Sequence, residues 1–216
     1  MLTIDYKNAI HPKCGKEVQT YKDIIVTPFY TEKFCDEIVK MAKFYDKKFS
    51  PYIYYILDRS SKKSDNSPWD TLLFSRISQI LFENFCDHYK KYICPLLEKT
   101  FFPETISGWF SPMIIKYSKK GQKVKLHNDI SLFTLNVKLN TNYKGCHVEF
   151  PRQQWNNKDL PKGWCMIWPS QVTHPHQSQP LLKGTKYTLS AWTHPLPWTV
   201  DGHGGSIFYK NVIQKN

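Results

Sequence analysis

The chain has 216 residues, 41% of them hydrophobic and 15% aromatic, and it carries 30 lysine and arginine residues against 18 aspartate and glutamate residues. This length fits one domain with a substantial core, and the apolar content excludes general disorder. The formal net charge of +12 favours anionic partners and disfavours basic ones, although the lysines are dispersed and most are expected on a solvated surface.

The start of the chain has no basic segment followed by a long apolar run. We therefore expect neither a signal peptide nor a transmembrane helix. An intact chain is then expected to be soluble and intracellular (cytoplasmic), with its six cysteines reduced.

Helices are predicted in the first half of the chain. Residues 23–29 are expected to be extended, and a helix is predicted to begin near Thr31, because threonine is a suitable N-cap. Four apolar residues of this helix recur at helical spacing and should face the core: Phe34, Ile38, Met41 and Tyr45. The polar residues 59–68 are interpreted as a loop, either an active-site lid or a surface insertion.

A second, longer helix is predicted over residues 72–93. It should end near Pro95, because the residue before a proline disfavours the helical conformation. Its apolar residues form a stripe suited to packing on a sheet: Leu73, Ile77, Ile80, Leu81 and Phe85.

After Pro112 the pattern changes from helices to short strands. Strands are predicted over residues 113–118, 123–129, 131–139, 146–150, 164–168 and 187–193, and residues 153–159 are predicted to form a surface loop. Helices followed by strands indicate an α+β fold, and many short antiparallel strands favour a jelly roll made of two sheets.

A His-x-Asp pair lies in one of these predicted strands. Residues i and i+2 of a strand point to the same side, so His127 and Asp129 can hold one ion. This oxygen and nitrogen pair suits iron or manganese, and the absence of any Cys-x-x-Cys pair disfavours zinc. With a second imidazole and open positions, it would match the metal site of a non-haem Fe(II) oxygenase. His174 and His176 are both candidates for a third ligand, and the residues alone do not choose between them. The alternative is a hydrogen-bonded pair at a strand end that holds no metal.

Several segments resemble the procollagen lysyl hydroxylases, which are 2-oxoglutarate-dependent dioxygenases related to the prolyl 4-hydroxylases. The resemblance is carried by KLHNDISLFTLNVKLN at residues 125–140, PKGWCMIWP at 161–169, THPH at 173–176 and KGTKY at 183–187. Two upstream segments, residues 34–39 and 92–99, fit the helical part of the same domain.

This resemblance implies a double-stranded β-helix, which is a jelly roll, with bracing helices on its N-terminal side. It places an N-terminal arm at residues 1–22, a dioxygenase domain at 23–195 and a C-terminal extension at 196–216. Within the domain, residues 23–111 would be the helical part and 112–195 the jelly roll.

The resemblance also implies roles for individual residues. The iron ligands would be His127, Asp129 and His176, because the family's second histidine lies ten residues before a basic residue, which here is Lys186. That leaves a structural or supporting role for His174. Lys186 would bind the distal carboxylate of 2-oxoglutarate. Lysyl hydroxylases have arginine at this position and collagen prolyl 4-hydroxylases have lysine, so the difference bears on the substrate more than on the chemistry.

Three other residues are placed near the cosubstrate. Tyr117 matches a tyrosine that lies beside 2-oxoglutarate in lysyl hydroxylases, and its hydroxyl can donate to the same carboxylate. Thr134 and Asn136 follow the iron-binding pair and are expected to line the pocket, unless they are polar residues satisfied within the barrel.

The function implied by the resemblance is hydroxylation of a protein side chain with Fe(II), 2-oxoglutarate, O2 and ascorbate. The expected substrate is lysine in collagen-like sequences or another peptide, with proline as an alternative, and the expected assembly is a homodimer. If the chain is part of a larger secretory protein, the expected compartment is the endoplasmic reticulum. The alternative is an oxygenase that acts on nucleic acid. It is favoured by the net charge and by three aromatic residues that could stack on a base, Trp109, Phe110 and Trp155, although no nucleic-acid-binding motif is present. A barrel without catalytic activity is disfavoured, because a scaffold needs neither the triad nor Lys186.

Overall fold

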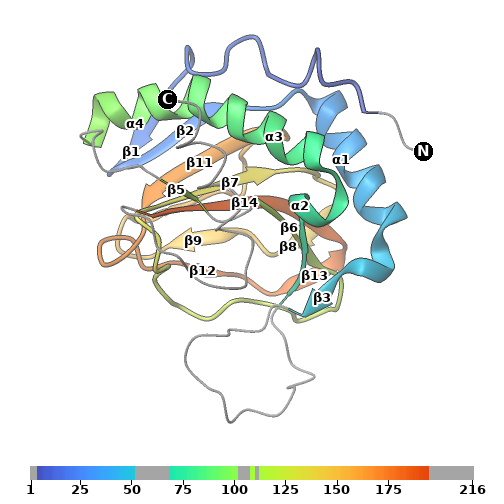
Figure 1. Ribbon diagram of the computed structural model, residues 1–216. Helices are drawn as coiled ribbons and strands as arrows, with labels where there is room; N and C mark the ends of the chain where they lie inside the picture. The colour runs from blue at the N-terminus through green and yellow to red at the C-terminus, as the bar shows by residue number, and fades with distance from the viewer. Residues whose placement is uncertain (1–3, 52–68, 102–107, 110–111, 195–216) are drawn as a thin grey trace.

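The computed structural model describes residues 4–51, 69–101, 108–109 and 112–194 of the chain. Its largest unit is a nine-stranded antiparallel sheet with the strand order β1-β2-β11-β7-β14-β6-β4-β3, in which β5 also pairs with β14 (Figure 1). These strands are Gln19–Tyr21 (β1), Ile24–Pro28 (β2), Ser50–Pro51 (β3), Asp70–Leu73 (β4), Gly108–Trp109 (β5), Met113–Tyr117 (β6), Phe133–Lys138 (β7), Trp164–Pro169 (β11) and Lys186–His194 (β14).

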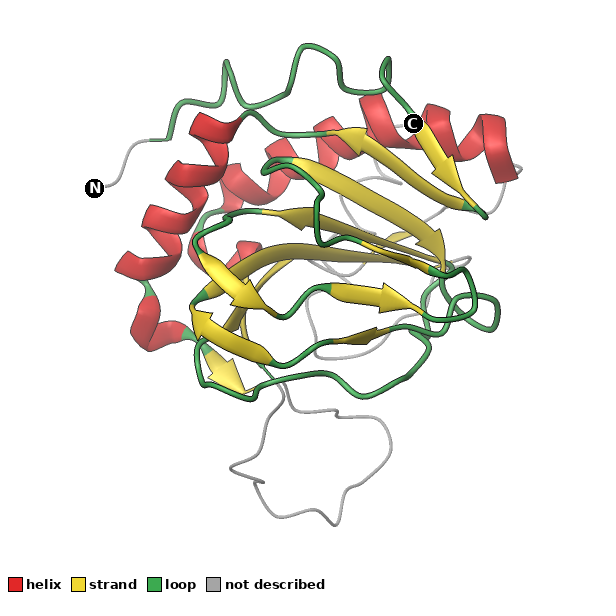
Figure 2. Cartoon of the chain, turned by 180° about the vertical axis from the view of Figure 1, so that it is seen from behind, coloured by secondary structure: helices red, strands yellow, loops and turns green. Residues whose placement is uncertain are grey.

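Two smaller antiparallel sheets lie on one face of the large sheet, and the helices lie on the other (Figures 1 and 2). The small sheets are formed by Trp155–Asn156 (β10), Val148–Phe150 (β9) and Gln177–Ser178 (β12), and by Leu181–Gly184 (β13) and Tyr143–Gly145 (β8). The helical segments are Glu32–Phe44 (α1), the 3-10 helix Asp46–Lys48 (η1), Phe74–Ile77 (α2), Gln79–His88 (α3), the π-helix Tyr89–Ile93 (η2) and Cys94–Phe101 (α4). Facing sheets with helices on the outside give the predicted α+β jelly roll.

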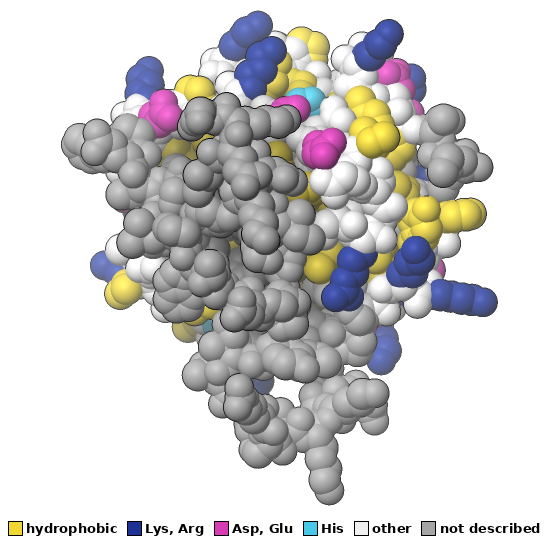
Figure 3. Space-filling view, viewed as in Figure 1, with side chains coloured by type: hydrophobic (Ala, Val, Ile, Leu, Met, Phe, Trp, Pro, Cys, Tyr) yellow, Lys and Arg dark blue, Asp and Glu magenta, His cyan; other side chains and the backbone are white. Residues whose placement is uncertain are grey.

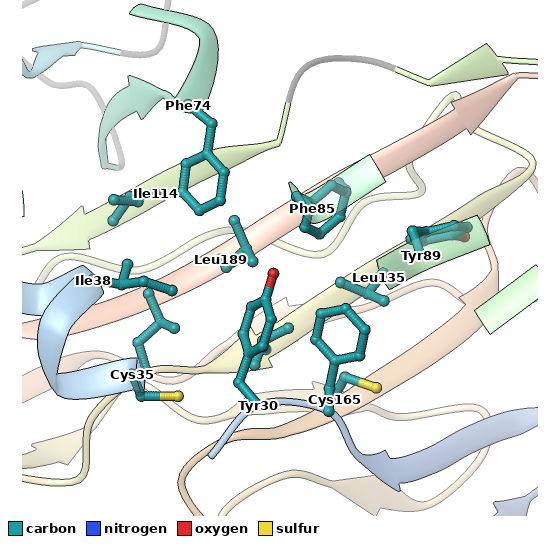
Figure 4. Packing of buried hydrophobic residues seen from close by; sticks show 14 of the residues in the cluster. Tyr30, Cys35, Ile38, Phe74, Phe85, Tyr89, Ile114, Leu135, Cys165 and Leu189 are labelled. Atoms are coloured by element: carbon teal, nitrogen blue, oxygen red, sulfur yellow. The ribbon is translucent and has the colours of Figure 1, made fainter. Parts of the chain in front are cut away.

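The alternation of side chains along β7 separates the hydrophobic core from the interior of the barrel. All six residues of β7 are buried, because helices cover one face of the strand and the small sheets cover the other. Leu135 and Val137 belong to the main core on the helix side, whereas Thr134, Asn136 and Lys138 alternate with them and face the barrel interior. Figure 4 shows Ile38 from α1, Phe85 from α3 and Leu189 from β14 directed into this core. Polar side chains thus gather on the inner face of the sheet.

Helix α1 begins where the sequence predicts. Thr31 is its N-cap and accepts a hydrogen bond from the backbone N–H of Phe34 at 3.3 Å. The predicted core residues Phe34, Ile38 and Met41 are buried. Tyr45, the C-cap residue, is only partly buried against the same core.

The prediction of one helix over residues 72–93 is wrong. Leu72 and Leu73 lie in β4, where they pair with Ile114 and Met113, so tertiary pairing overrides their helical spacing. Ser78 then interrupts the helical segments with an extended backbone and caps α3 by accepting a hydrogen bond from Leu81 N–H at 3.3 Å.

The predicted end of this helix near Pro95 is also wrong. Pro95 is the second residue of α4 and follows the π-helix η2, where the wider hydrogen-bond pattern tolerates its missing N–H. In the predicted apolar stripe, Leu81 and Phe85 are buried as expected, and Ile77 is partly buried. The prediction that Ile80 packs on the sheet is wrong, because this residue is 59% exposed.

Most of the predicted strands are present in the structure. Those over residues 113–118, 131–139, 146–150, 164–168 and 187–193 correspond to β6, β7, β9, β11 and β14. The predicted strand over residues 123–129 is wrong: only His127 of this segment makes a β-bridge. The predicted loop at 153–159 contains the short strand β10.

Some expectations concern residues that the structure does not describe. The predicted loop at 59–68, Phe110 and the C-terminal extension at 196–216 lie outside the described residues, and the proposed domain boundaries stay predictions.

All six cysteines are free. Among the described residues, no helix has the length and apolar character needed to cross a membrane.

Gly163 fixes the junction between β11 and the start of α1. Its carbonyl accepts hydrogen bonds from the N–H groups of Phe29 and Tyr30, and its φ of +84° favours glycine. A Cβ at this position would lie 2.1 Å from the carbonyl oxygen of Tyr30. We expect Gly163→Ala to lower the free energy of unfolding by about 2 kcal/mol or more, as measured by urea denaturation.

Gly121→Ala provides the matched control for this prediction. Gly121 has a similar φ of +88°, but a Cβ there would meet no atom within 4 Å. The loss in the free energy of unfolding of Gly121→Ala should therefore come from the positive φ alone. An equal loss of stability in both variants would show that the close approach to Tyr30 contributes nothing.

Candidate metal centre

Two distant segments bring the His-x-Asp pair together with a second histidine. His127 and His176 form an antiparallel β-bridge, with backbone hydrogen bonds of 3.0 and 2.9 Å in the two directions. Asp129 Oδ1 lies 3.4 Å from His127 Nε2, and Asp129 Oδ2 lies 3.6 Å from His176 Nε2. One possible ligand atom from each of these three residues lies within 4.8 Å of the ligand atoms of the other two. Among the described residues, no other three His, Cys, Asp or Glu side chains come together in this way.

Backbone carbonyl groups fix the orientation of both imidazole rings. His127 Nδ1 lies 2.9 Å from the carbonyl oxygen of Lys125, and His176 Nδ1 lies 3.1 Å from that of His174. A carbonyl can only accept, so each Nδ1 carries a proton and each ring turns its Nε2 toward Asp129. Two imidazole lone pairs and a carboxylate that face each other are the arrangement that a cation requires.

A chain of hydroxyl groups orients the carboxylate of Asp129. The hydroxyl of Thr134 donates to Asp129 Oδ2 at 2.6 Å. The hydroxyl oxygens of Ser131 and Ser170 lie 2.9 and 2.8 Å from Thr134 Oγ1. Because the single proton of Thr134 is directed to Asp129, Ser131 donates to Thr134. The hydroxyl of Ser170 has two acceptors within reach, Thr134 Oγ1 and, at 3.2 Å, the carbonyl oxygen of Trp168. All four side chains are buried, so this network fixes the carboxylate within the barrel.

Burial and mutual charge shift the ionisation of the three residues. Burial favours the neutral ring of His127, but the hydrogen bond and charge of Asp129 outweigh it and raise the pKa of His127 above 6.5. Burial dominates at His176 and lowers its pKa. For Asp129, burial raises the pKa, but the hydrogen bond with His127, the charge of His176 and the hydrogen bond from Thr134 together hold it below 3.8. Asp129 is therefore the anionic member of the group.

The structure distinguishes His174 from His176, the two candidates for the third metal ligand. His174 is buried, but its Nε2 lies 3.0 Å from the carbonyl oxygen of Lys22 and its Nδ1 lies 2.8 Å from the hydroxyl of Thr173. It therefore ties the turn between β1 and β2 to the segment before β12. Only His176 joins His127 and Asp129.

The three residues lie at one side of a pocket inside the barrel. Thr134 and Asn136 are among the residues that line it, and Asn136 Oδ1 accepts a hydrogen bond from Thr188 at 2.7 Å. Much of the remaining wall is aromatic or apolar: Trp69, Ile115, Tyr117, Val124, Val148, Trp168 and Trp192. Such a wall limits the access of water to whatever occupies the pocket.

Lys186 lies behind this pocket, next to Tyr117. The two residues are directly opposite each other on β14 and β6, and Lys186 Nζ lies 5.1 Å from the centre of the Tyr117 ring. Nζ donates to the carbonyl oxygen of Cys146 at 2.7 Å. Within the described part of the chain, no carboxylate lies within 4 Å of this ammonium group, and burial lowers the pKa of Lys186 below 10.5. A buried lysine without an acidic partner is suited to an anionic ligand.

Several residues of the site gave no signal in the sequence. Ser131 and Ser170 orient Thr134, and Trp168 packs edge-on against His176 with their ring centres 5.0 Å apart. Serine and tryptophan occur widely in strands and loops, so only the fold reveals these contacts. Trp155, considered for base stacking, instead stacks on Tyr21 at 5.5 Å and does not line the pocket.

Comparison with known proteins supports the resemblance. Procollagen-lysine,2-oxoglutarate 5-dioxygenase 2 of Homo sapiens is 29% identical over 183 residues, which cover 82% of this chain and 24% of that protein. Procollagen-lysine,2-oxoglutarate 5-dioxygenase 1 of Rattus norvegicus is 27% identical over 201 residues, which cover 88% of this chain and 26% of that protein. The chain thus spans about a quarter of the length of these relatives. No family model matches it.

Solved structures confirm the predicted fold. The viral collagen prolyl hydroxylase of Paramecium Bursaria Chlorella virus-1, solved with 2OG, superposes with a TM-score of 0.57 at 18% identity and covers 81% of this chain and 97% of its own. A prolyl hydroxylase from Trichoplax adhaerens, in complex with a hypoxia inducible factor peptide fragment, gives a TM-score of 0.66 at 15% identity and covers 80% and 84% of the two chains. The α+β jelly roll with its bracing helices is therefore a fold that this chain shares with these two prolyl hydroxylases.

Proposed function

We propose that the chain is an Fe(II)- and 2-oxoglutarate-dependent dioxygenase that hydroxylates a protein side chain, and that its substrate is lysine in collagen-like sequences. The observation that carries this proposal is the group formed by His127, Asp129 and His176, with both Nε2 atoms directed at one carboxylate. The similarity to procollagen-lysine dioxygenases over most of the chain supports the same chemistry.

The residues present fit iron and its cosubstrate. Two imidazole nitrogens and one carboxylate leave coordination positions open, and the donor set has no thiolate. His127, Asp129 and His176 would hold the metal, and Lys186 would bind the distal carboxylate of 2-oxoglutarate. When bound, the iron couples the oxidative decarboxylation of 2-oxoglutarate by O2 to the hydroxylation of an unactivated C–H bond.

The protein itself contributes orientation, charge and the exclusion of water. Thr134 holds Asp129 as an oriented anion, and the two backbone carbonyls hold both histidines with Nε2 directed at Asp129. Tyr117 lines the pocket of the metal group, and Lys186 Nζ lies 5.1 Å from the centre of its ring, so its hydroxyl could donate to the carboxylate that Lys186 would bind. The aromatic wall keeps water away from the reacting C–H bond. Hydrogen bonds within the protein hold these groups in place, so little reorganisation would accompany the reaction.

The contact between Thr134 and Asp129 should contribute directly to metal affinity. We expect Thr134→Val to weaken Co(II) binding by about 10- to 100-fold, because it removes the donor that orients the carboxylate of the ligand. Calorimetric titration of the metal-free protein with Co(II) measures this effect without reference to catalysis.

Thr134→Ser is the matched control, because it keeps the hydroxyl and removes only a methyl group. It should retain Co(II) affinity within about threefold. If the valine variant binds Co(II) as tightly as the wild type, the hydroxyl network of Ser131, Thr134 and Ser170 has only a packing role.

The choice of substrate can be tested by a panel of candidate substrates. Succinate release from 2-oxoglutarate with Fe(II) and ascorbate would be compared for lysine-containing collagen peptides, proline-rich collagen peptides and single-stranded oligonucleotides. The proposal predicts stimulation by the lysine peptides, with one added oxygen atom on lysine detected by mass spectrometry. The oligonucleotides belong in the panel because the net charge of +12 disfavours basic peptides. Oxygen added to proline or to a base would correct the substrate and leave the cofactor chemistry in place.

A further inference from the structure

A second hollow lies at the opposite end of β7 and β14 from the metal group. Thr134 and Trp192, which pair with each other, line the metal pocket, whereas Asn140 and Thr185 beyond the other ends of these strands line the second hollow. It is a groove of about 680 Å³ between α1 and two turns of the barrel. Helix α1 contributes Asp36, Lys40 and Lys43 to its lining, and one of the turns contributes Asn140, Thr141 and Asn142.

We propose that this groove, called here the α1 groove, binds an anion that carries several phosphate groups. The proposal is independent of the proposed function at the metal centre. Figure 3 shows dark blue basic side chains gathered at the lower right of the molecule, over the C-terminal end of α1 and the adjacent η1 of Figure 1. Lys43, near the C-terminal end of α1, is one of the residues that line the α1 groove.

The α1 groove carries an excess of positive charge that the protein does not neutralise. Its acidic residue, Asp36, forms an ion pair with Lys162. Lys162 Nζ lies 3.0 Å from both carboxylate oxygens of Asp36 and 3.3 Å from the carboxylate of Glu32. Lys40 and Lys43 are both exposed and come from the same side of α1. Within the described residues, neither forms an ion pair. Two ammonium groups therefore face the groove without an anionic partner.

The opposite wall adds hydrogen-bond donors. Asn140 is satisfied within the protein, because its amide group donates to Asn142 and to the carbonyl of Thr185 and its oxygen accepts from Tyr187 N–H. In the described part of the chain, the side-chain oxygen of Asn142 accepts from Asn140, whereas no partner is recorded for its amide nitrogen or for the hydroxyl of Thr141. A ligand rich in acceptor oxygens would satisfy these donors.

A like-charged pair lies in the two strands that adjoin turns of the α1 groove. Lys183 and Lys144 are directly opposite each other on β13 and β8, and both are exposed. Gly184, next to Lys183, lines the groove. Like charges directly opposite on two strands are destabilising unless a counter-charge lies nearby. A multivalent anion in the groove would supply that charge.

These features favour phosphate over a single carboxylate. Lysine ammonium groups bind as point charges that suit phosphate oxygens, and several separated cations match several anionic groups. The anion can be a free polyphosphate or the phosphodiester backbone of a single strand, which share this chemistry. The experiment described next distinguishes the two sources.

The test is binding of inorganic triphosphate, measured by calorimetry at low ionic strength, for the wild type and two double variants. Lys40→Gln with Lys43→Gln removes the unpaired charges of the α1 groove. Lys90→Gln with Lys91→Gln removes the same charge from exposed positions of η2 outside the groove. Fluorescence anisotropy with a single-stranded oligothymidylate provides the second arm. All four positions are exposed, so folding should be preserved, and circular dichroism checks it.

We expect the groove variant to weaken triphosphate binding by about tenfold or more, because two charge-assisted hydrogen bonds are lost, and the η2 variant to change it by less than about twofold. If only oligothymidylate binding depends on Lys40 and Lys43, the phosphodiester backbone is the source of the anion. Equal losses in both variants would assign the binding to net charge and overturn the proposal. Absence of binding in both arms would overturn it as well.

Discussion

Asp129→Ala is expected to abolish stoichiometric Fe(II) binding and, with it, turnover. Asp129 supplies the only negative charge in the group and lies between the Nε2 atoms of His127 and His176. Changing a partner that merely orients a ligand costs about 10- to 100-fold in affinity, so loss of the ligand itself should exceed about 100-fold. Anaerobic calorimetric titration with Fe(II) measures this loss, and His176→Ala should give a similar result.

His174→Ala is the matched control for the loss of His176. His174 is buried and bonded to the carbonyl of Lys22, so its removal should lower the melting temperature through lost packing and hydrogen bonding. Its Fe(II) stoichiometry should nevertheless stay at one. If His174→Ala loses the metal while His176→Ala retains it, the assignment of ligands is reversed.

Lys186→Ala is expected to raise the 2-oxoglutarate requirement steeply while the metal remains bound. Lys186 is 2% exposed and its ammonium group has no acidic partner among the described residues, so a bound carboxylate would form a buried charge pair with it. Truncating one partner of such a pair costs about 2 to 5 kcal/mol, which is about 30-fold or more in affinity. The dissociation constant of 2-oxoglutarate, measured in the presence of Fe(II), gives the effect.

The pH dependence of 2-oxoglutarate binding separates a charged contact from a packing effect. Burial lowers the pKa of Lys186 from 10.5, and the anion binds the protonated amine. Affinity should therefore fall as pH rises through this lowered pKa, at a pH below that of an ordinary lysine. Lys186→Arg stays charged throughout this range and should lose the alkaline fall, even if its absolute affinity differs. The same fall in the arginine variant would remove Lys186 from the cosubstrate site.

The sequence predicted those parts of the site that depend on spacing. His127 and Asp129 are two residues apart, and any extended backbone places such side chains on the same side. The expected strand is absent, yet a single bridge to His176 keeps the segment extended at the point where it matters. The strands β6, β7 and β14 were predictable as well, because they alternate between a helix-covered face and a barrel interior.

Other features depend on contacts between segments that are distant in the sequence. Leu72 and Leu73 have helical spacing but pair with β6, and Ser78 can be recognised as an N-cap only once the chain bends there. The network of Ser131, Thr134 and Ser170 joins residues up to 39 positions apart around one carboxylate. The α1 groove is formed by a helix and two turns that no local pattern connects.

The measurement that tests the central claim most directly is the titration of 2-oxoglutarate into the protein under anaerobic conditions, with and without Fe(II). If the metal group and Lys186 form one cosubstrate site, 2-oxoglutarate should bind once per chain and tightly only when Fe(II) is present. Both Asp129→Ala and Lys186→Ala should weaken this binding. Equal binding with and without Fe(II), unaffected by either variant, would show that the three residues and Lys186 do not form a 2-oxoglutarate oxygenase site.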